Sequence, residues 1–135
     1  MQAIIVISLV LHVLSGVFWA GSTFTLARTG AAGGQTLFRP QMGAATIALI
    51  TGVALWFLLH RGSPGTTEYL LALGALSAII AAGVQGVWGG AETRMLVSAD
   101  EGAASRSQAR LATAQRVAGA LLAITVVCMA AARYA

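Results

Sequence analysis

Charged residues are scarce in this sequence. They make up 9% of its 135 residues, whereas a water-soluble domain needs about 25% to cover its surface. All eight basic residues are arginines, and lysine is absent. Cysteine occurs once, as Cys128, which excludes an intrachain disulfide. These shortages exclude a water-soluble globular domain, and lipid is the expected solvent of the chain.

Apolar residues, in contrast, are abundant and form four long runs. The runs cover residues 3–27, 42–60, 69–89 and 117–132, and none has a charged residue in its interior. About 20 apolar residues cross the ~30 Å hydrocarbon core of a bilayer, and a helix satisfies its own backbone polar groups there. The sequence therefore predicts an all-α fold, a single domain over residues 1–135 that forms a four-helix transmembrane bundle of up-down-up-down topology.

The first run is expected to be a retained helix and not a signal peptide. It is longer than the apolar core of such a peptide, and no basic residue precedes it. The short connection over 61–68 predicts that the second and third helices are antiparallel neighbours. The connection from Gly90 to Thr113 has a helix-forming composition. It predicts that the third and fourth helices extend beyond the bilayer, with a break near Gly102.

Arginines are distributed unevenly between the two sides of this bundle. One side is predicted to carry six arginines and the other side two. The larger group comprises Arg28, Arg39, Arg94, Arg106, Arg110 and Arg116, and the smaller group Arg61 and Arg133. Because cytoplasmic loops carry the excess of basic residues, both termini are expected outside. In a bacterium this is the periplasmic side of the inner membrane.

Polar and small residues follow one face of the first run. Their spacings of three, four and seven place them on one side of a helix, and such a stripe is expected to point into the bundle. The stripe consists of Ser8, His12, Ser15, Gly16, Trp19, Ser22 and Thr23. Counting the rise per residue predicts a polar layer, made of His12, Thr51, Ser77 and Thr125. It also puts Trp19 near the level of Gln85.

His12 is the strongest candidate for a functional residue, because ionisable side chains inside a membrane are functional candidates by default. Its imidazole can ligate haem iron or copper, or pass a proton. The alternative is a neutral histidine bonded to Thr51 or Thr125. Gly16 lies one turn away on the same face and would leave room for a flat cofactor. The candidate cofactor-binding residues are therefore His12, Gly16, Trp19 and Thr51.

A copper site is a further possibility, since imidazole and soft sulfur ligands suit copper. Its candidate ligands are His12, His60 and Cys128, although counting places His60 about 12 Å closer to the outer mouth than His12. Cys128 is more simply a small packing residue. No nucleophile–base group and no phosphate loop is visible, so no catalytic residue is assigned and an enzyme is not favoured. The basic charge lies at helix ends and does not indicate nucleic acid.

The segment Leu11-His12-Val-Leu-Ser-Gly16-Val-Phe-Trp19-Ala-Gly21 resembles the first helix of a group of bacterial membrane proteins. The group comprises the copper-resistance protein D-like proteins, the membrane protoporphyrinogen oxidases and the membrane cytochrome domain found with some urate oxidases. Phe38-Arg39, Thr51-Gly52 and the run 110–116 are also similar. The resemblance implies b-type haem or copper binding at His12. The protoporphyrinogen oxidases also use a lysine, which this chain lacks.

Three functions are consistent with these features. The first is a small haem-binding membrane protein with a role in electron transfer or a redox step. Its haem would be five-coordinate, or shared between the two His12 residues of a homodimer. The second is a cofactor-free accessory subunit that packs on a larger membrane complex. The third is a copper-handling membrane protein.

Overall fold

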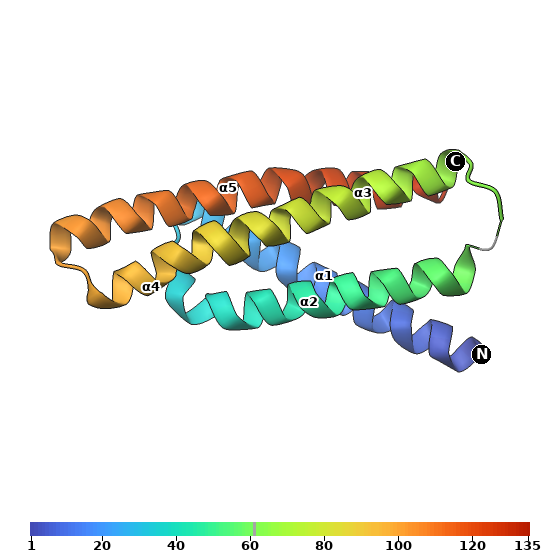
Figure 1. Cartoon of the computed structure of the whole chain (residues 1–135), viewed down its shortest axis with the longest axis horizontal. Helices are drawn as coiled ribbons and strands as arrows, with labels where there is room; N and C mark the ends of the chain where they lie inside the picture. Colours follow the sequence, from blue (N-terminus) through green and yellow to red (C-terminus); the bar gives the residue numbers. More distant parts are fainter. Residues whose placement is uncertain (61) are drawn as a thin grey trace.

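The computed structural model describes residues 1–60 and 62–135, and these residues form helices joined by short connections. The elements are α1 (Gln2–Arg28), α2 (Gly34–Leu59), α3 (Thr66–Gly83), the π-helix η1 (Val84–Gly89), α4 (Gly90–Ser98) and α5 (Glu101–Ala132). The elements α3, η1 and α4 follow one another without interruption and form one rod, Thr66–Ser98 (Figure 1). Arg61 lies outside the described residues.

Within residues 1–60 and 62–135, four helices are long and apolar enough to cross a membrane. They contain 27, 26, 33 and 32 residues, counting Thr66–Ser98 as one. The predicted all-α four-helix bundle is confirmed, and the chain is a small multi-pass membrane protein by its length and composition. The helices are longer than the apolar runs, as expected for the third and fourth. The break between those two falls at Ala99 and Asp100, close to the predicted Gly102, and there the Asp100 carboxylate caps α5 by accepting a bond of 2.8 Å from the Ala103 amide.

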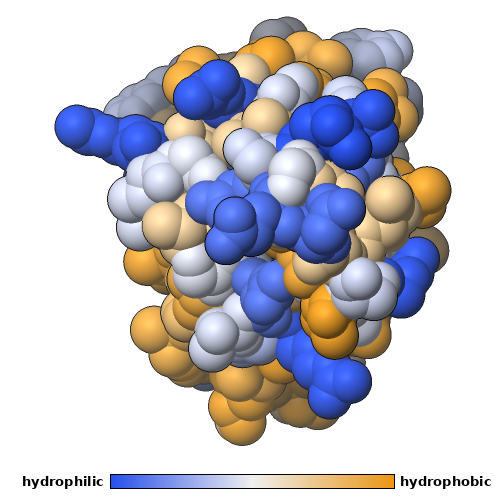
Figure 2. Space-filling model, turned by 90° about the vertical axis from the view of Figure 1, so that its left-hand side faces the viewer, coloured by the Kyte–Doolittle hydropathy of each residue, from blue (hydrophilic) through white to orange (hydrophobic). Residues whose placement is uncertain are grey.

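The bundle has two distinct ends (Figure 1). Both chain termini and the α2–α3 connection lie at one, here called the terminal end. The α1–α2 and α4–α5 connections lie toward the other, here called the arginine-rich end, and the hairpin of α4 and α5 reaches farthest there. Seen from that side, hydrophilic side chains gather over the end and apolar side chains flank it (Figure 2). This arrangement agrees with the up-down-up-down topology.

The four helices pack as two hairpins. Helix α1 packs along α2, and α3 packs along α5, while α1 and α5 join the hairpins on one flank. Small residues allow close approach: a Cβ added at Gly74 would lie 3.2 Å from the Cys128 Cβ and 3.3 Å from the Thr125 carbonyl oxygen. Helices α2 and α3 are antiparallel, as predicted, but they contact each other only sparsely. The short connection between them therefore does not make them close neighbours.

The polar stripe of α1 faces the protein. None of its seven residues is exposed, whereas the intervening Val13, Leu14, Val17 and Phe18 are exposed on the outside of the bundle. The prediction that the stripe points inward is confirmed. It meets a core built mainly of alanines around Trp19 and Leu122.

Candidate functional site

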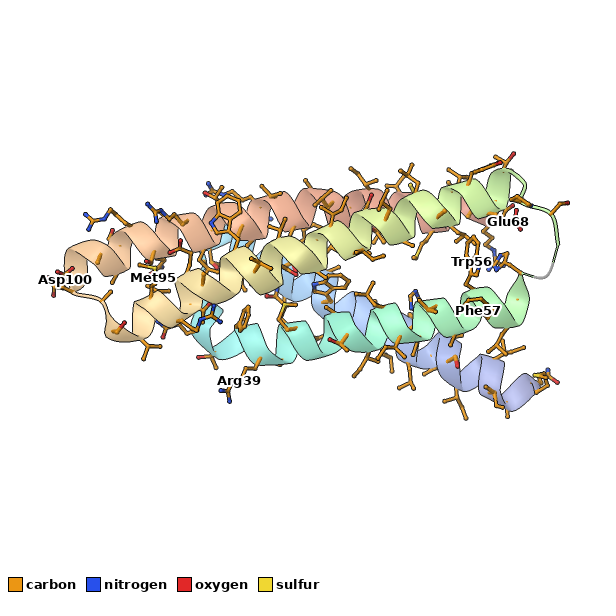
Figure 3. All side chains as sticks on the ribbon, in the orientation of Figure 1. Arg39, Trp56, Phe57, Glu68, Met95 and Asp100 are labelled. Carbon is orange, nitrogen blue, oxygen red and sulfur yellow. The ribbon has the colours of Figure 1, made fainter. Side chains whose placement is uncertain are left out.

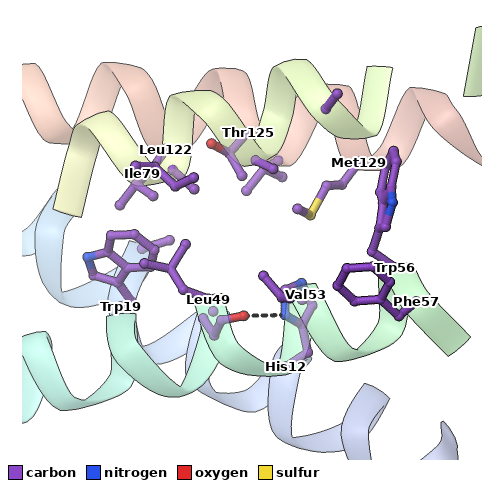
Figure 4. Close-up of a pocket in the computed structure, with 18 residues that line it drawn as sticks. His12, Trp19, Leu49, Val53, Trp56, Phe57, Ile79, Leu122, Thr125 and Met129 are labelled. Atoms are coloured by element: carbon purple, nitrogen blue, oxygen red, sulfur yellow. Dashed lines mark hydrogen bonds between the residues drawn. The ribbon is translucent and has the colours of Figure 1, made fainter. Parts of the chain in front are cut away.

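A cavity of about 440 Å³ separates the two hairpins in the half of the bundle toward the terminal end (Figure 4). Helices α1 and α2 form one wall, and α3 and α5 form the other. The lining is almost entirely apolar. His12 and Gly16 contribute from α1, Gly52 from α2, and Thr125 and Met129 from α5. This size and this chemistry are typical of a site for an apolar small molecule.

An indole lies at each end of the cavity. Trp19 is 3% exposed and lies at the end toward the middle of the bundle. Trp56 projects from α2 into the gap between the hairpins at the terminal end (Figure 3). The His60 ring stacks on Trp56, with centroids 5.1 Å apart and an interplanar angle of 26°. Two aromatic walls therefore separate the cavity from the two ends of the bundle.

His12 is held by the helix beside it. Its Nδ1 lies 2.8 Å from the Ala48 carbonyl oxygen and 3.3 Å from the Thr51 hydroxyl, both on α2. A carbonyl oxygen only accepts hydrogen bonds, so Nδ1 carries the proton. Within the described residues, Nε2 makes no hydrogen bond. The lone pair of Nε2 is thus left available on a ring that lines the cavity.

Two glycines shape the space around this imidazole. A Cβ added at Gly52 would lie 3.0 Å from His12 Cε1 and 3.4 Å from its Nδ1, closer than a methyl group normally approaches. Gly52 therefore allows the ring to lie against α2. At Gly16 an added Cβ would meet nothing within 4 Å. Gly16 instead leaves open space in the cavity wall, one turn from His12.

The predicted polar layer is divided between the two hairpins. His12 and Thr51 meet on one side, but Thr51 does not line the cavity. Thr125 lies on the opposite wall and donates a hydrogen bond of 3.0 Å to the Gly74 carbonyl oxygen, so it joins α5 to α3. Ser77 is buried on α3 and does not line the cavity.

Beyond Trp19 lies a network of buried amides that sequence analysis missed. Thr23, Gln41, Gln85 and Gln115 come from α1, α2, η1 and α5, and none is more than 1% exposed. The Gln85 amide nitrogen donates to Thr23 Oγ1 and to Gln115 Oε1, each at 2.9 Å. Gln41 and Gln115 exchange two bonds of 3.2 Å. This amide network links all four membrane-crossing helices.

The network also holds the end wall of the cavity. The Trp19 indole nitrogen donates a hydrogen bond of 2.6 Å to Gln85 Oε1, which agrees with the level predicted for these two residues. Gln85 lies in the π-helix Val84–Gly89. Short π-helical segments inside α-helices occur frequently at functional sites. The segment carries Gln85, the residue that fixes Trp19.

The candidate copper ligands do not form one group. Among the described residues, no set of three or more His, Cys, Asp or Glu side chains is arranged to hold a metal ion. Cys128 is buried against Gly74 at the α3–α5 contact and does not line the cavity. His60 stacks on Trp56 and is likewise not a lining residue. Of the three, only His12 lines the cavity.

The fold and the cavity define a multi-pass helical membrane protein of the four-helix-bundle class. No family model matches the chain, and no curated protein and no solved structure matches it either. The resemblance of residues 11–21 to the first helix of the copper-resistance protein D-like group stays a prediction.

Proposed function

We propose that this protein is a small haem-binding membrane protein, with b-type haem held in the cavity between the hairpins and a role in electron transfer. The observation that carries the proposal is the state of His12. Its Nδ1–H donates to the Ala48 carbonyl oxygen, and its Nε2 is without a hydrogen bond among the described residues. A histidine that ligates a metal typically donates its other ring N–H to a carbonyl or carboxylate in this way.

The opposite wall offers a second ligand. The Met129 side chain lines the cavity from α5, across from His12 on α1 (Figure 4). Histidine and methionine together are one of the axial ligand pairs of haem proteins. The two ligands would come from different hairpins. We therefore favour ligation by His12 and Met129 of one chain over a haem shared between two copies.

The rest of the cavity fits a flat apolar macrocycle. Its volume of about 440 Å³ falls within the range of small-molecule sites, roughly 300–1,000 Å³. Trp19 and Trp56 form its ends, Gly16 leaves space one turn from His12, and the apolar side chains of the lining would exclude water from a bound haem. When bound, haem supplies a one-electron redox couple, whose potential depends on its axial ligands and on burial.

The orientation follows from charge. The arginine-rich end is proposed to face the cytoplasm, because basic residues accumulate on the cytoplasmic side. The terminal end, with both termini and the cavity, would then face the periplasm of a bacterium, and the protein would reside in the inner membrane. The apolar helix faces would contact lipid.

The test is the absorption spectrum of the protein, purified in detergent and reconstituted with haem. The native chain and His60→Ala are expected to show a Soret band that shifts on reduction. His12→Ala is expected to lose it, because the imidazole is gone. Met129→Leu is expected to retain the Soret band but to convert the ferric haem to the high-spin form. Absence of a Soret band in the native chain would contradict the proposal.

The same preparation separates the alternatives. Copper that binds with a defined stoichiometry, in place of haem, would support copper handling. Co-purification with a larger membrane complex, without any cofactor, would favour the accessory role.

A further inference from the structure

Some residues of the cavity wall also form part of the outer surface of the bundle. Val53 is 57% exposed, Phe57 71% and Ile79 55%, yet each lines the cavity. A side chain that both lines a cavity and lies on the outside marks the edge of an opening. The residues with this double character are Val53, Phe57, Ala72, Ile79 and Val126. All but Val126 lie on α2 or α3.

The main opening therefore lies between α2 and α3. These helices contact each other only sparsely, in contrast to the α1–α2 and α3–α5 pairs. Small lining residues, Ala72 and Ala75, lie on the α3 side of the opening, so no bulky side chain from these positions closes it. Figure 4 looks into the cavity with α2 and α3 on opposite sides of it.

An indole stands at each of the two ends of the cavity that face the water phases. At the terminal end Trp56, with His60 stacked on it, stands across the cavity. At the other end Trp19 is bonded to Gln85, and the amide network lies behind it. The opening between α2 and α3 lies within the stretches of both helices that are apolar and long enough to cross a membrane, so it is expected to face the hydrocarbon core.

We propose that the cavity is accessible sideways from the bilayer, between α2 and α3, and that a hydrocarbon chain of a lipid occupies this opening. The apolar rim offers no hydrogen-bonding group to water, and a chain of methylene groups matches it. A ligand of the cavity would reach it through the lipid phase. This inference rests on the cavity alone and does not require haem, so the experiment uses protein without haem.

The experiment measures quenching of Trp19 fluorescence in a variant with Trp56→Phe and Trp88→Phe, in which Phe keeps an aromatic ring at position 56. The protein is reconstituted in phosphatidylcholine vesicles with brominated acyl chains. Trp19 is only 3% exposed, yet it is expected to be quenched by the brominated chains that enter the opening. Acrylamide in the aqueous phase is expected to quench it weakly.

Two matched substitutions on α3 identify the route. Ala72→Phe places a ring at the rim of the opening, and quenching by brominated lipid is expected to fall strongly. Leu76→Phe adds a ring to an exposed position that does not line the cavity, and quenching is expected to stay at the parent level. Circular dichroism verifies that both variants retain their helices.

Two results would overturn the proposal. One is quenching of Trp19 by acrylamide that exceeds quenching by brominated lipid, which would indicate access from water. The other is equal quenching in the two variants, whether strong or absent, which would indicate that the opening between α2 and α3 is not the route. Neither result depends on the Soret band that tests haem binding.

Discussion

The two halves of this bundle are held together in different ways. In the half toward the arginine-rich end, the two hydrogen bonds between Gln41 and Gln115 and the bond from Gln85 to Thr23 cross between the hairpins. In the half toward the terminal end, apolar walls face each other around a cavity. Lipid is as apolar as these walls, so burial against another helix gains little for them, whereas amides lose their partners if the helices separate. Polar contacts therefore decide where the two hairpins close on each other.

Trp19 and His12, both on the inward face of α1, show the same difference. Trp19 is bonded to Gln85 on the opposite hairpin. His12, about two turns away, is bonded to Ala48 on its own hairpin. At the level of Trp19, this hydrogen bond therefore holds the two hairpins together. The hairpins are free to stand apart at the level of His12, and this leaves room for a ligand.

The largest effect on stability is expected from Gln115→Leu, which removes a central member of the amide network. Gln41 Oε1 loses the bond from Gln115, and Gln85 loses one of its acceptors. We expect the free energy of unfolding to fall by about 1–3 kcal/mol, because buried amide groups are left without partners. The measurement is reversible unfolding in mixed detergent micelles. Gln35→Leu, at an exposed position on α2 whose side chain makes no hydrogen bond among the described residues, is the control and should change stability by less than about 0.5 kcal/mol.

An intermediate effect, confined to the ligand site, is expected from Gly52→Ala. The new methyl group would lie 3.0 Å from His12 Cε1 and must displace the imidazole. We expect haem affinity to fall about tenfold or more, as for other changes that disturb the orientation of a ligating histidine, and the NMR signals of the imidazole to shift. The measurement is haem titration followed at the Soret band. Gly43→Ala is the control, because a Cβ added there on the same helix meets nothing within 4 Å. Equal haem affinities of Gly52→Ala and Gly43→Ala would contradict the prediction.

The smallest effect is expected from Thr125→Val, in the half with the cavity. The substitution keeps the side-chain volume and removes the bond of 3.0 Å to the Gly74 carbonyl oxygen. Interhelical hydrogen bonds of this kind contribute about 0.6 kcal/mol on average in a membrane protein. We expect a loss of that size in the same unfolding assay. A loss as large as that of Gln115→Leu would show that the two halves are equally dependent on polar contacts.

The sequence alone predicted more of the fold than of the site. Trp19 and Gln85 were placed at one level by counting, and His12 and Thr51 likewise, because a helix advances by a constant rise. Gln41 and Gln115 were missed for a simple reason: each lies just outside an apolar run, where hydropathy indicates a connection. The helices continue past those limits and carry both amides into the bundle.

The sequence by itself determined that this chain forms four apolar helices, that the polar face of α1 turns inward and that the charge lies mostly at one end. These properties follow from composition and period, since lipid excludes charge and a helix repeats every 3.6 residues. Only the tertiary structure decided that three glutamines meet, that α2 and α3 stand apart and that His12 Nε2 is left without a hydrogen bond. Those outcomes depend on how far each helix extends and on which side chains meet across the bundle, and neither is encoded in any single run.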